Sequence, residues 1–197
     1  MSDMTQPASM KGLLGALSGD QQFSAILAPA MGRLILRGDH EVARLAGEAL
    51  GVACPLTALG SASHGTNSAL WLGPDEWLLL TAAGDLSGFG NRLAMDLGDV
   101  PHSLVDVSHR QLGFELKGRL AARVLTSGCP LDLGLRAFPV GTVTRTLFHK
   151  AEVVLWRRAD GFHLEVWRSF APYVLGHLLA ARRAAEGLQD NALPPAG

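Results

Sequence analysis

Charged residues and cysteines are both scarce in this chain of 197 residues. Lys, Arg, Asp and Glu together make up 18% of it, below the roughly 25% that soluble domains usually carry. The 17 basic and 18 acidic residues nearly cancel, so there is no basic excess to attract phosphates, which argues against nucleic-acid binding. The two cysteines, Cys54 and Cys129, are too few for a disulfide framework, and we expect them to be reduced.

Long apolar runs are missing as well. No uninterrupted stretch approaches the roughly 20 residues that a membrane-spanning helix needs. Residues 1–10 also lack the charged and apolar regions of a secretory signal, so we expect a cytoplasmic protein without membrane contact. Apolar residues nonetheless make up 48% of the chain, and a surplus not covered by its own fold would suit a buried subunit interface.

The hydrophobic patterns predict an α+β fold. Short apolar or alternating runs predict strands at 31–37, 69–72, 76–81, 103–106, 111–116, 142–150, 152–157 and 162–167. Helical spacing predicts helices from Asp39 to Cys54, over 88–98, over 118–127 and from Ser169 onward. Residues 57–67 are interpreted as a loop. Residues 1–30 are interpreted as an N-terminal arm with a short helix near 11–17, and residues 187–197 as a flexible tail.

Two parts of the sequence resemble each other. Leu36–Gly38 and Leu116–Gly118 each precede a predicted helix, and Cys54–Leu56 and Cys129–Leu131 each follow one. The alternative is coincidence among common residue types. The repeat predicts a single domain over 31–186, built from two pseudo-repeated strand–helix–hairpin–helix units, 31–100 and 101–186. Their mixed or antiparallel sheets would carry packed helices. Cysteines at matching helix ends are then structural rather than reactive.

No common catalytic pattern is present in the sequence. It has no G-x-S-x-G elbow, no G-x-G-x-x-G after a strand and no Walker loop. The histidines form no H-x-x-x-H pair and no Cys/His cluster; they are His40, His64, His102, His109, His149, His163 and His177. We place His163 on the solvent or partner face of its strand and His177 near the buried stripe of the last helix. We therefore expect no catalytic, cofactor-binding or metal-ligating residue in this chain.

Two polar groups remain as candidates for an interface. Asp106–Arg110 (DVSHR) holds an acid, a hydroxyl, an imidazole and a guanidinium, and we interpret it as a turn or interface rather than a catalytic site. The last hairpin carries Arg and Trp, the side chains enriched at protein interfaces, and we favour an interface over an exposed strand face. Its residues are Trp156, Arg157, Arg158, Trp167 and Arg168.

Five ordered blocks give the sequence a resemblance to a known family. They are Trp71–Leu78 (WLGPDEWL), Val105–Arg110 (VDVSHR), Leu116–Gly118 (LKG), Ser127–Leu133 (SGCPLDL) and Val166–Ala171 (VWRSFA). With these blocks the chain resembles the gamma subunit of heterotetrameric sarcosine oxidase over roughly residues 30–185.

The resemblance implies a role without an active site of its own. The enzyme of that family has alpha, beta, gamma and delta subunits, and it demethylates sarcosine to glycine with oxygen and tetrahydrofolate, in sarcosine catabolism and one-carbon metabolism. Flavins, nicotinamide dinucleotide, folate and zinc are expected on the partner subunits. The gamma chain is similar in fold to the folate-binding domain of the aminomethyltransferase of the glycine cleavage system.

Two hypotheses follow for this chain. The first is a non-catalytic gamma subunit of the oxidase complex. The second is a stand-alone folate-binding or aminomethyltransferase-like one-carbon protein, for which Asp75 or Asp106 would be the carboxylate that holds the pterin.

Overall fold

The strand-forming segments of this chain assemble into two separate sheets. The computed structural model describes residues 9–18 and 21–190, and within them ten strands form two antiparallel sheets of five. Sheet A has the strand order β1–β7–β10–β9–β8, and sheet B has the order β3–β4–β5–β2–β6. The strands are β1 (Ser24–Leu27), β2 (Met31–Arg37), β3 (Ser61–His64), β4 (Asn67–Gly73), β5 (Glu76–Ala82), β6 (Ser103–Asp106), β7 (Gln111–Lys117), β8 (Val143–Phe148), β9 (Ala151–Arg158) and β10 (Gly161–Trp167).

Turn residues fix the two predicted hairpins. Pro74 and Asp75 connect β4 to β5, which pair from Gly73 opposite Glu76 onward, with a shift in register before Trp71 opposite Trp77. At the turn between β9 and β10, Gly161 has a φ of 150°, and a Cβ there would collide with the carbonyl oxygen of Leu116. Only glycine fits at that close approach to the neighbouring strand β7.

Helices lie between the strands where the sequence has helical spacing and capping residues. The Asp39 side chain caps α2 (His40–Leu50) by accepting hydrogen bonds from the backbone of Glu41 and Val42, as predicted, and Gly51 ends the helix with a φ of 73°. The other helices are α1 (Met10–Leu17), α3 (Leu86–Leu97), α4 (Ala121–Thr126) and α5 (Ala171–Asp190). Short 3-10 turns precede α3 at Ala83–Asp85 (η1) and α5 at Arg168–Phe170 (η2).

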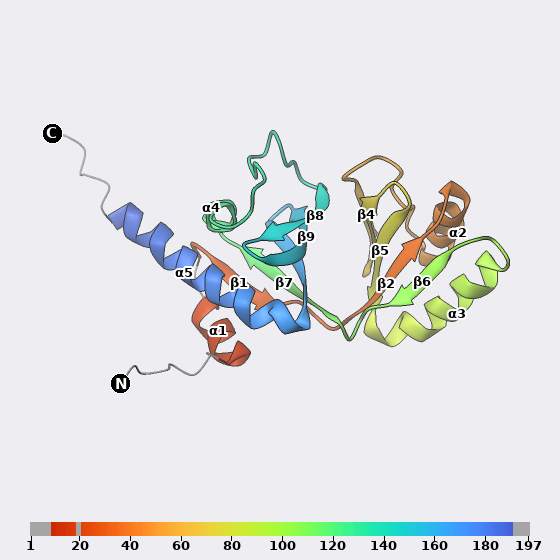
Figure 1. Ribbon diagram of the computed structural model, residues 1–197, viewed down its shortest axis with the longest axis horizontal. Helices are drawn as coiled ribbons and strands as arrows, with labels where there is room; N and C mark the ends of the chain where they lie inside the picture. The colour runs from red at the N-terminus through yellow and green to blue at the C-terminus, as the bar shows by residue number, and fades with distance from the viewer. Residues whose placement is uncertain (1–8, 19–20, 191–197) are drawn as a thin grey trace.

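The elements stack in four layers (Figure 1). Helices α2 and α3 cover the outer face of sheet B, and α1, α4 and α5 cover the outer face of sheet A. The two inner faces meet each other, so three apolar clusters form: one under each helical layer and one between the sheets. The cluster between the sheets contains Leu70, Leu78, Leu80, Val107, Val143, Val154 and Trp156.

Each half of the chain contributes one strand to the sheet of the other half. Strand β1 precedes β2 in sequence but pairs with β7 in sheet A, and β6 precedes β7 but pairs with β2 in sheet B. Reading sheet B from β6 to β3 and sheet A from β1 to β8, the strands correspond one to one. The predicted pair of strand–helix–hairpin–helix units with antiparallel sheets is therefore confirmed.

Three sequence predictions need correction. The expected N-terminal arm is part of the domain, because α1 packs against the α5 layer and β1 is a strand of sheet A, with Phe23 fully buried. Within the predicted loop 57–67, residues Ser61–His64 form β3; this strand has little apolar content and is fixed by pairing with β4. The first part of the expected tail, 187–190, continues α5, while 191–197 lie outside the described residues.

Candidate functional site

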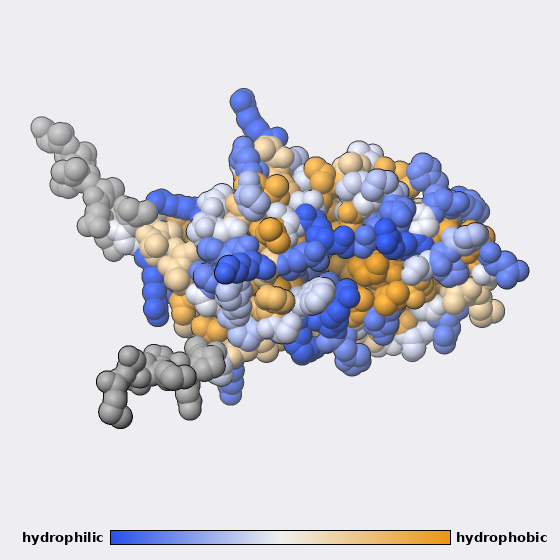
Figure 2. Space-filling view, in the orientation of Figure 1, coloured by the Kyte–Doolittle hydropathy of each residue, from blue (hydrophilic) through white to orange (hydrophobic). Residues whose placement is uncertain are grey.

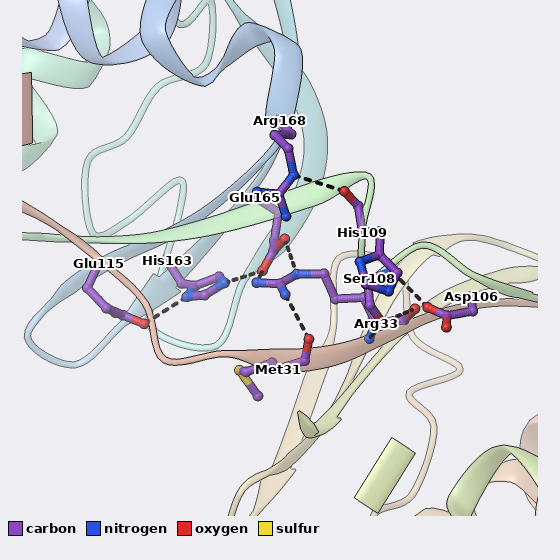
Figure 3. A network of polar contacts seen from close by, with 9 residues as sticks. All are labelled: Met31, Arg33, Asp106, Ser108, His109, Glu115, His163, Glu165 and Arg168. Carbon is purple, nitrogen blue, oxygen red and sulfur yellow. Dashed lines mark hydrogen bonds and ion pairs between the residues drawn. The ribbon is translucent and has the colours of Figure 1, made fainter. Parts of the chain in front are cut away.

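A row of polar side chains lies between the two sheets, where apolar packing would be expected. In β10 the side chains of Phe162, Leu164 and Val166 face the helices, so the alternation of the strand turns His163 and Glu165 toward sheet B. Figure 3 shows these two side chains meeting Arg33 of β2 and Glu115 of β7. The site is therefore assembled from both halves of the chain.

The four side chains form a continuous chain of hydrogen bonds. Arg33 donates to both carboxylate oxygens of Glu165, at 2.7 and 2.9 Å, and its remaining Nη1 donates to the carbonyl of Met31 at 2.9 Å. His163 Nε2 lies 2.8 Å from Glu165 Oε1, and His163 Nδ1 lies 2.7 Å from Glu115 Oε1. The bidentate Arg–carboxylate contact is the strong geometry for a buried pair.

The sequence provides space for this network at one glycine. Gly113 of β7 lies opposite Glu165 in the strand register. A Cβ at position 113 would come within 2.7 Å of Glu165 Oε1, 2.8 Å of His163 Cε1 and 2.9 Å of Arg33 Nη2. The absence of a side chain at Gly113 is thus what allows three charged groups to meet in the interior.

The charges of the network balance when His163 is protonated. Burial by itself lowers the pKa of His163, but hydrogen bonds to Glu115 and Glu165 and their negative charges outweigh burial and raise it to about 9. Burial favours the neutral form of Glu165, yet His163 and Arg33 lower its pKa below the usual value. The pKa of Glu115 is lowered too, because His163 outweighs its partial burial. Two cations thus face two carboxylates.

This arrangement is suited to holding the two sheets together rather than to reacting with a substrate. A general acid or base needs a proton that can move to a bound molecule, and a nucleophile needs a free lone pair. In the network, each charged group already contacts a group of opposite charge inside the protein. What the geometry can supply is a fixed distance and orientation between sheets A and B.

The prediction for His163 was wrong. We expected this residue on a solvent or partner face, but its side chain is 3% exposed and faces sheet B. The available signal was the repeat itself: two sheets that each carry helices on one face must turn their other faces toward each other. With that constraint, the alternate residues His163 and Glu165 would have been placed between the layers, and Arg33 in its apolar strand would have been the partner to look for.

Asp106–Arg110 forms a turn, as predicted. The Asp106 carboxylate accepts a hydrogen bond from the Ser108 backbone at 2.8 Å. The Ser108 side chain and then this backbone bond lower the pKa of Asp106. The Ser108 hydroxyl accepts one from the Arg33 backbone at 2.8 Å, and the Arg110 backbone donates to Val107 O at 3.0 Å. The turn therefore lies directly beside the network and fixes the backbone of Arg33 (Figure 3).

Clefts flank the network between the sheets. One, of about 250 Å³, reaches Glu165 and opens between β6 and β8. Another, of about 340 Å³, reaches Glu115 and His163. Neither carboxylate proposed for a pterin lies in them: Asp75 is in the exposed β4–β5 turn beside Arg37 at 3.4 Å, and Asp106 is in the turn described above.

The cysteines and the Arg/Trp hairpin residues are also placed. Cys54 and Cys129 are both buried and unpaired with each other, and burial raises the pKa of the Cys54 thiol to about 12, which makes it unreactive. In the last hairpin Trp156 is buried and Arg158 lies over its ring, whereas Trp167 is exposed beneath Arg110. Of these hairpin residues, Trp167 and Arg168 are exposed and available to a partner.

The remaining histidines do not gather around a ligand position. His149 and His177 stack with ring centroids 4.1 Å apart on the far side of sheet A. In the part of the chain that the structure describes, no group of three or more His, Cys, Asp or Glu side chains has a metal-binding arrangement. Among the same residues, no helix is both long and apolar enough to cross a membrane.

Comparison with solved structures agrees with this architecture. A chain of the heterotetrameric sarcosine oxidase from Corynebacterium sp. U-96, solved with pyrrole 2-carboxylate, has a TM-score of 0.78 and 25% identity, over 95% of each chain. The aminomethyltransferase T of the glycine cleavage system from Bartonella henselae has a TM-score of 0.64 at 16% identity, over 87% of this chain and 50% of that one. The second likeness shows a shared fold.

Comparison with known sequences points to the same group of proteins. The sarcosine oxidase gamma subunits of Corynebacterium sp. strain P-1 and of an Arthrobacter species are 34% and 38% identical, over 74% and 57% of this chain. The aligned segments span 71% and 55% of those two proteins. The model of the sarcosine oxidase gamma subunit family matches residues 37–184, a range that includes Glu115, His163 and Glu165 of the inter-sheet network but not Arg33 or β1. Because this match covers most of the chain, the chain belongs to this family.

Proposed function

We propose that this chain is the non-catalytic gamma subunit of a heterotetrameric sarcosine oxidase. The enzyme would demethylate sarcosine to glycine with oxygen and tetrahydrofolate. Its alpha, beta and delta subunits would carry the flavins, nicotinamide dinucleotide, folate and zinc, in the cytoplasm. In this complex the present chain would be a folded scaffold that positions its partners.

The observation that carries this proposal is the likeness to a whole chain of a solved oxidase. That likeness extends over 95% of both chains, so it includes both sheets and both helical layers. The family model over 37–184 supports the same role. The inter-sheet network supports a structural role as well, because its charged side chains are paired with each other.

Co-expression tests the proposal directly. A tagged copy of the full chain is expressed with the alpha, beta and delta subunits of the same organism and purified by the tag. We expect the three subunits to co-purify in equal amounts, with flavin absorbance and sarcosine-dependent production of hydrogen peroxide. The chain expressed alone should show neither. A flavin-free monomer with no affinity for these subunits would contradict the proposal.

Calorimetry addresses the folate-binding alternative. The structure gives it no specific support, because Asp75 and Asp106 are exposed and lie outside the clefts described above. Titrating the isolated chain with tetrahydrofolate should give no heat of binding. Saturable heat would favour a stand-alone one-carbon protein instead.

A further inference from the structure

The cleft that reaches Glu165 is bordered by exposed apolar side chains. Val105 on the edge strand β6 is 49% exposed, and Trp167 at the end of β10 is 41% exposed. Both line the cleft, together with Ile35 and Val153 on its walls. Figure 2 shows, on this face of the molecule, an apolar patch over β2 and β6 next to a band of charged side chains. A large exposed aromatic at the mouth of a cleft is typical of a protein-binding surface.

Most of the acidic side chains in the cleft are already neutralised. Glu76 and Glu152 lie 2.6 and 3.7 Å from Arg145, and Glu165 is bound by Arg33 and His163. The cleft therefore offers little negative charge to an incoming group.

The positive charges at the mouth of the cleft are not neutralised in the same way. Arg110 lies over the Trp167 ring, 5.0 Å from its centroid, and no described carboxylate is within ion-pair distance of its guanidinium. Among the residues that the structure places, Arg37 pairs with Asp75 alone, at 3.4 Å, and both side chains of this pair are more than half exposed. An exposed pair of this kind is weak. The mouth of the cleft is thus complementary to a carboxylate.

A buried amide adds a second requirement. Gln111 lines the cleft and is 7% exposed, and its buried Oε1 accepts no hydrogen bond from any described residue. A buried acceptor without a donor is unfavourable, so the position suits a ligand that donates an N–H. A small carboxylate would satisfy Arg110 but has no N–H to offer. A peptide has both backbone N–H groups and acidic side chains.

The neighbouring sheet edge suits an extended peptide as well. β6 is the last strand of sheet B and pairs only with β2 in the described structure, which leaves its outer edge open beside the cleft. Such an edge accepts another strand through main-chain hydrogen bonds.

We propose that the cleft lined by Val105, Arg110, Gln111 and Trp167 is the docking site for an acidic, extended segment of another subunit of the oxidase. The segment places a carboxylate against Arg110 and a backbone N–H against Gln111, and its apolar side chains cover Val105 and Trp167. This inference rests on the proposed function and names the surface through which the chain joins its complex.

Binding measurements with the assembled partner subunits test the site. The full chain is titrated against the co-expressed alpha, beta and delta subunits by biolayer interferometry. We expect Arg110→Glu and Trp167→Ala each to weaken binding by about tenfold or more, as for charged and aromatic residues at the centre of an interface. Matched controls are Arg123→Glu on α4 and Met95→Ala on α3, both exposed and outside the cleft, which should bind within about twofold of the unchanged chain. Circular dichroism verifies that every variant is folded.

Cross-linking identifies the occupant. With Val105→p-benzoylphenylalanine in the full complex, the cross-linked peptide should come from a partner subunit and contain Asp or Glu. A cross-link to a segment without acidic residues, or to a second copy of this chain, would overturn the inference. The inference would also be overturned if the Arg110→Glu and Trp167→Ala variants bound the partner subunits as well as the controls do. In that case the unchanged chain would still assemble, and the proposed function would stand. Failure of the unchanged chain to bind the three subunits would overturn both.

Discussion

At the scale of single residues, Arg33 shows how a buried charge is tolerated. It lies in β2 between apolar neighbours, and its side chain is almost entirely removed from water. Taking a guanidinium out of water is costly, and only a partner with good geometry and further hydrogen bonds offsets that cost. Glu165 and the carbonyl of Met31 supply both. The main effect of the ion pair is therefore on specificity: a packing of the two sheets that separated Arg33 from Glu165 would leave both charges buried without this contact.

Removing Arg33 should destabilise the fold strongly. Arg33→Met keeps most of the side-chain volume but leaves Glu165 buried with one cation in place of two. We expect the free energy of unfolding to fall by about 3 kcal/mol, since breaking one partner of a buried pair leaves an uncompensated charge. Urea denaturation measures it. The control is Arg44→Met on α2, whose pairs with Glu41 and Glu48 are exposed and should leave stability essentially unchanged. Equal losses in both variants would contradict the assignment.

His163 should make stability depend on pH between about 6.5 and 9. Its pKa is raised to about 9 in the folded chain, against an ordinary value near 6.5 in the unfolded chain. The folded state therefore holds this proton more tightly, so the stabilisation is fully present below about pH 6.5 and is lost as the pH rises through 9. The whole change is on the order of 3 kcal/mol.

Comparison with His163→Gln isolates this dependence from other titrating groups. Urea midpoints are measured at intervals from pH 6 to 9.5 for both proteins. The difference in free energy of unfolding between them should shrink steadily as the pH rises. A difference that stays constant over the range, or that grows, would show that His163 is neutral in the folded chain.

At the scale of elements, strand β1 shows whether the N-terminal segment belongs to the domain. Its neighbour Phe23 is fully buried in the core under the helices of sheet A, while Ile26, within the strand, is 43% exposed on its other face. Strand β1 also covers one edge of β7 along four residue pairs. The segment is thus part of the domain and not an appendage.

Two substitutions in this segment should differ sharply. Phe23→Ala removes a fully buried ring and should lower the free energy of unfolding by about 3–5 kcal/mol, because the surrounding core cannot collapse fully onto the cavity. Ile26→Ala, at a partly exposed position, should cost about 1 kcal/mol or less. Thermal or urea unfolding distinguishes them. Equally small losses would mean that the segment is a peripheral arm, as the sequence first indicated.

The predictable elements were those whose signal is local. Helix α2 was recognisable because Asp39 and the apolar spacing agree, although it ends at Leu50, before Gly51, rather than at the predicted Cys54. The hairpins were recognisable from their turn residues. Strand β3 was missed because Ser61–His64 carries almost no apolar pattern; Ser61 is fixed from outside, donating to Gly141 O and accepting from Trp156 Nε1. Strand β1 was missed because its stability comes from a partner strand in the other half.

The candidate site was not predicted, because its residues carry no local signal that they meet. Arg33 and Glu165 are far apart in the sequence. The residues around each of them show only that a charged side chain lies within an apolar strand. Their meeting depends on which face of each sheet turns inward. That choice is made by the helices covering the outer faces, which is a property of the whole fold.

At the scale of the whole molecule, the exchanged strands join the two halves into one unit. Sheet A receives β1 from the first half, and sheet B receives β6 from the second. The Arg33–Glu165 pair also crosses between the halves. Each half therefore lacks an edge strand of its own sheet and one side of the inter-sheet core.

The halves should not fold separately. Fragments covering 1–100 and 101–197 divide the chain between α3 and β6, at the boundary of its two halves. We expect neither fragment alone to show a cooperative thermal transition by circular dichroism, and an equimolar mixture to recover one. A cooperative transition in either fragment by itself would show that the exchange contributes little to folding.

The exchange also constrains the order of events during translation. Strand β1 leaves the ribosome among the first segments, but its partner β7 is synthesised only after the entire first half of the chain. Until then β1 cannot pair with β7. In the same way, the edge of β2 in sheet B stays unpaired until β6 has been synthesised. Newly made chains thus expose open strand edges from the synthesis of β1 until that of β7, an interval in which pairing with a neighbouring nascent chain competes with correct folding.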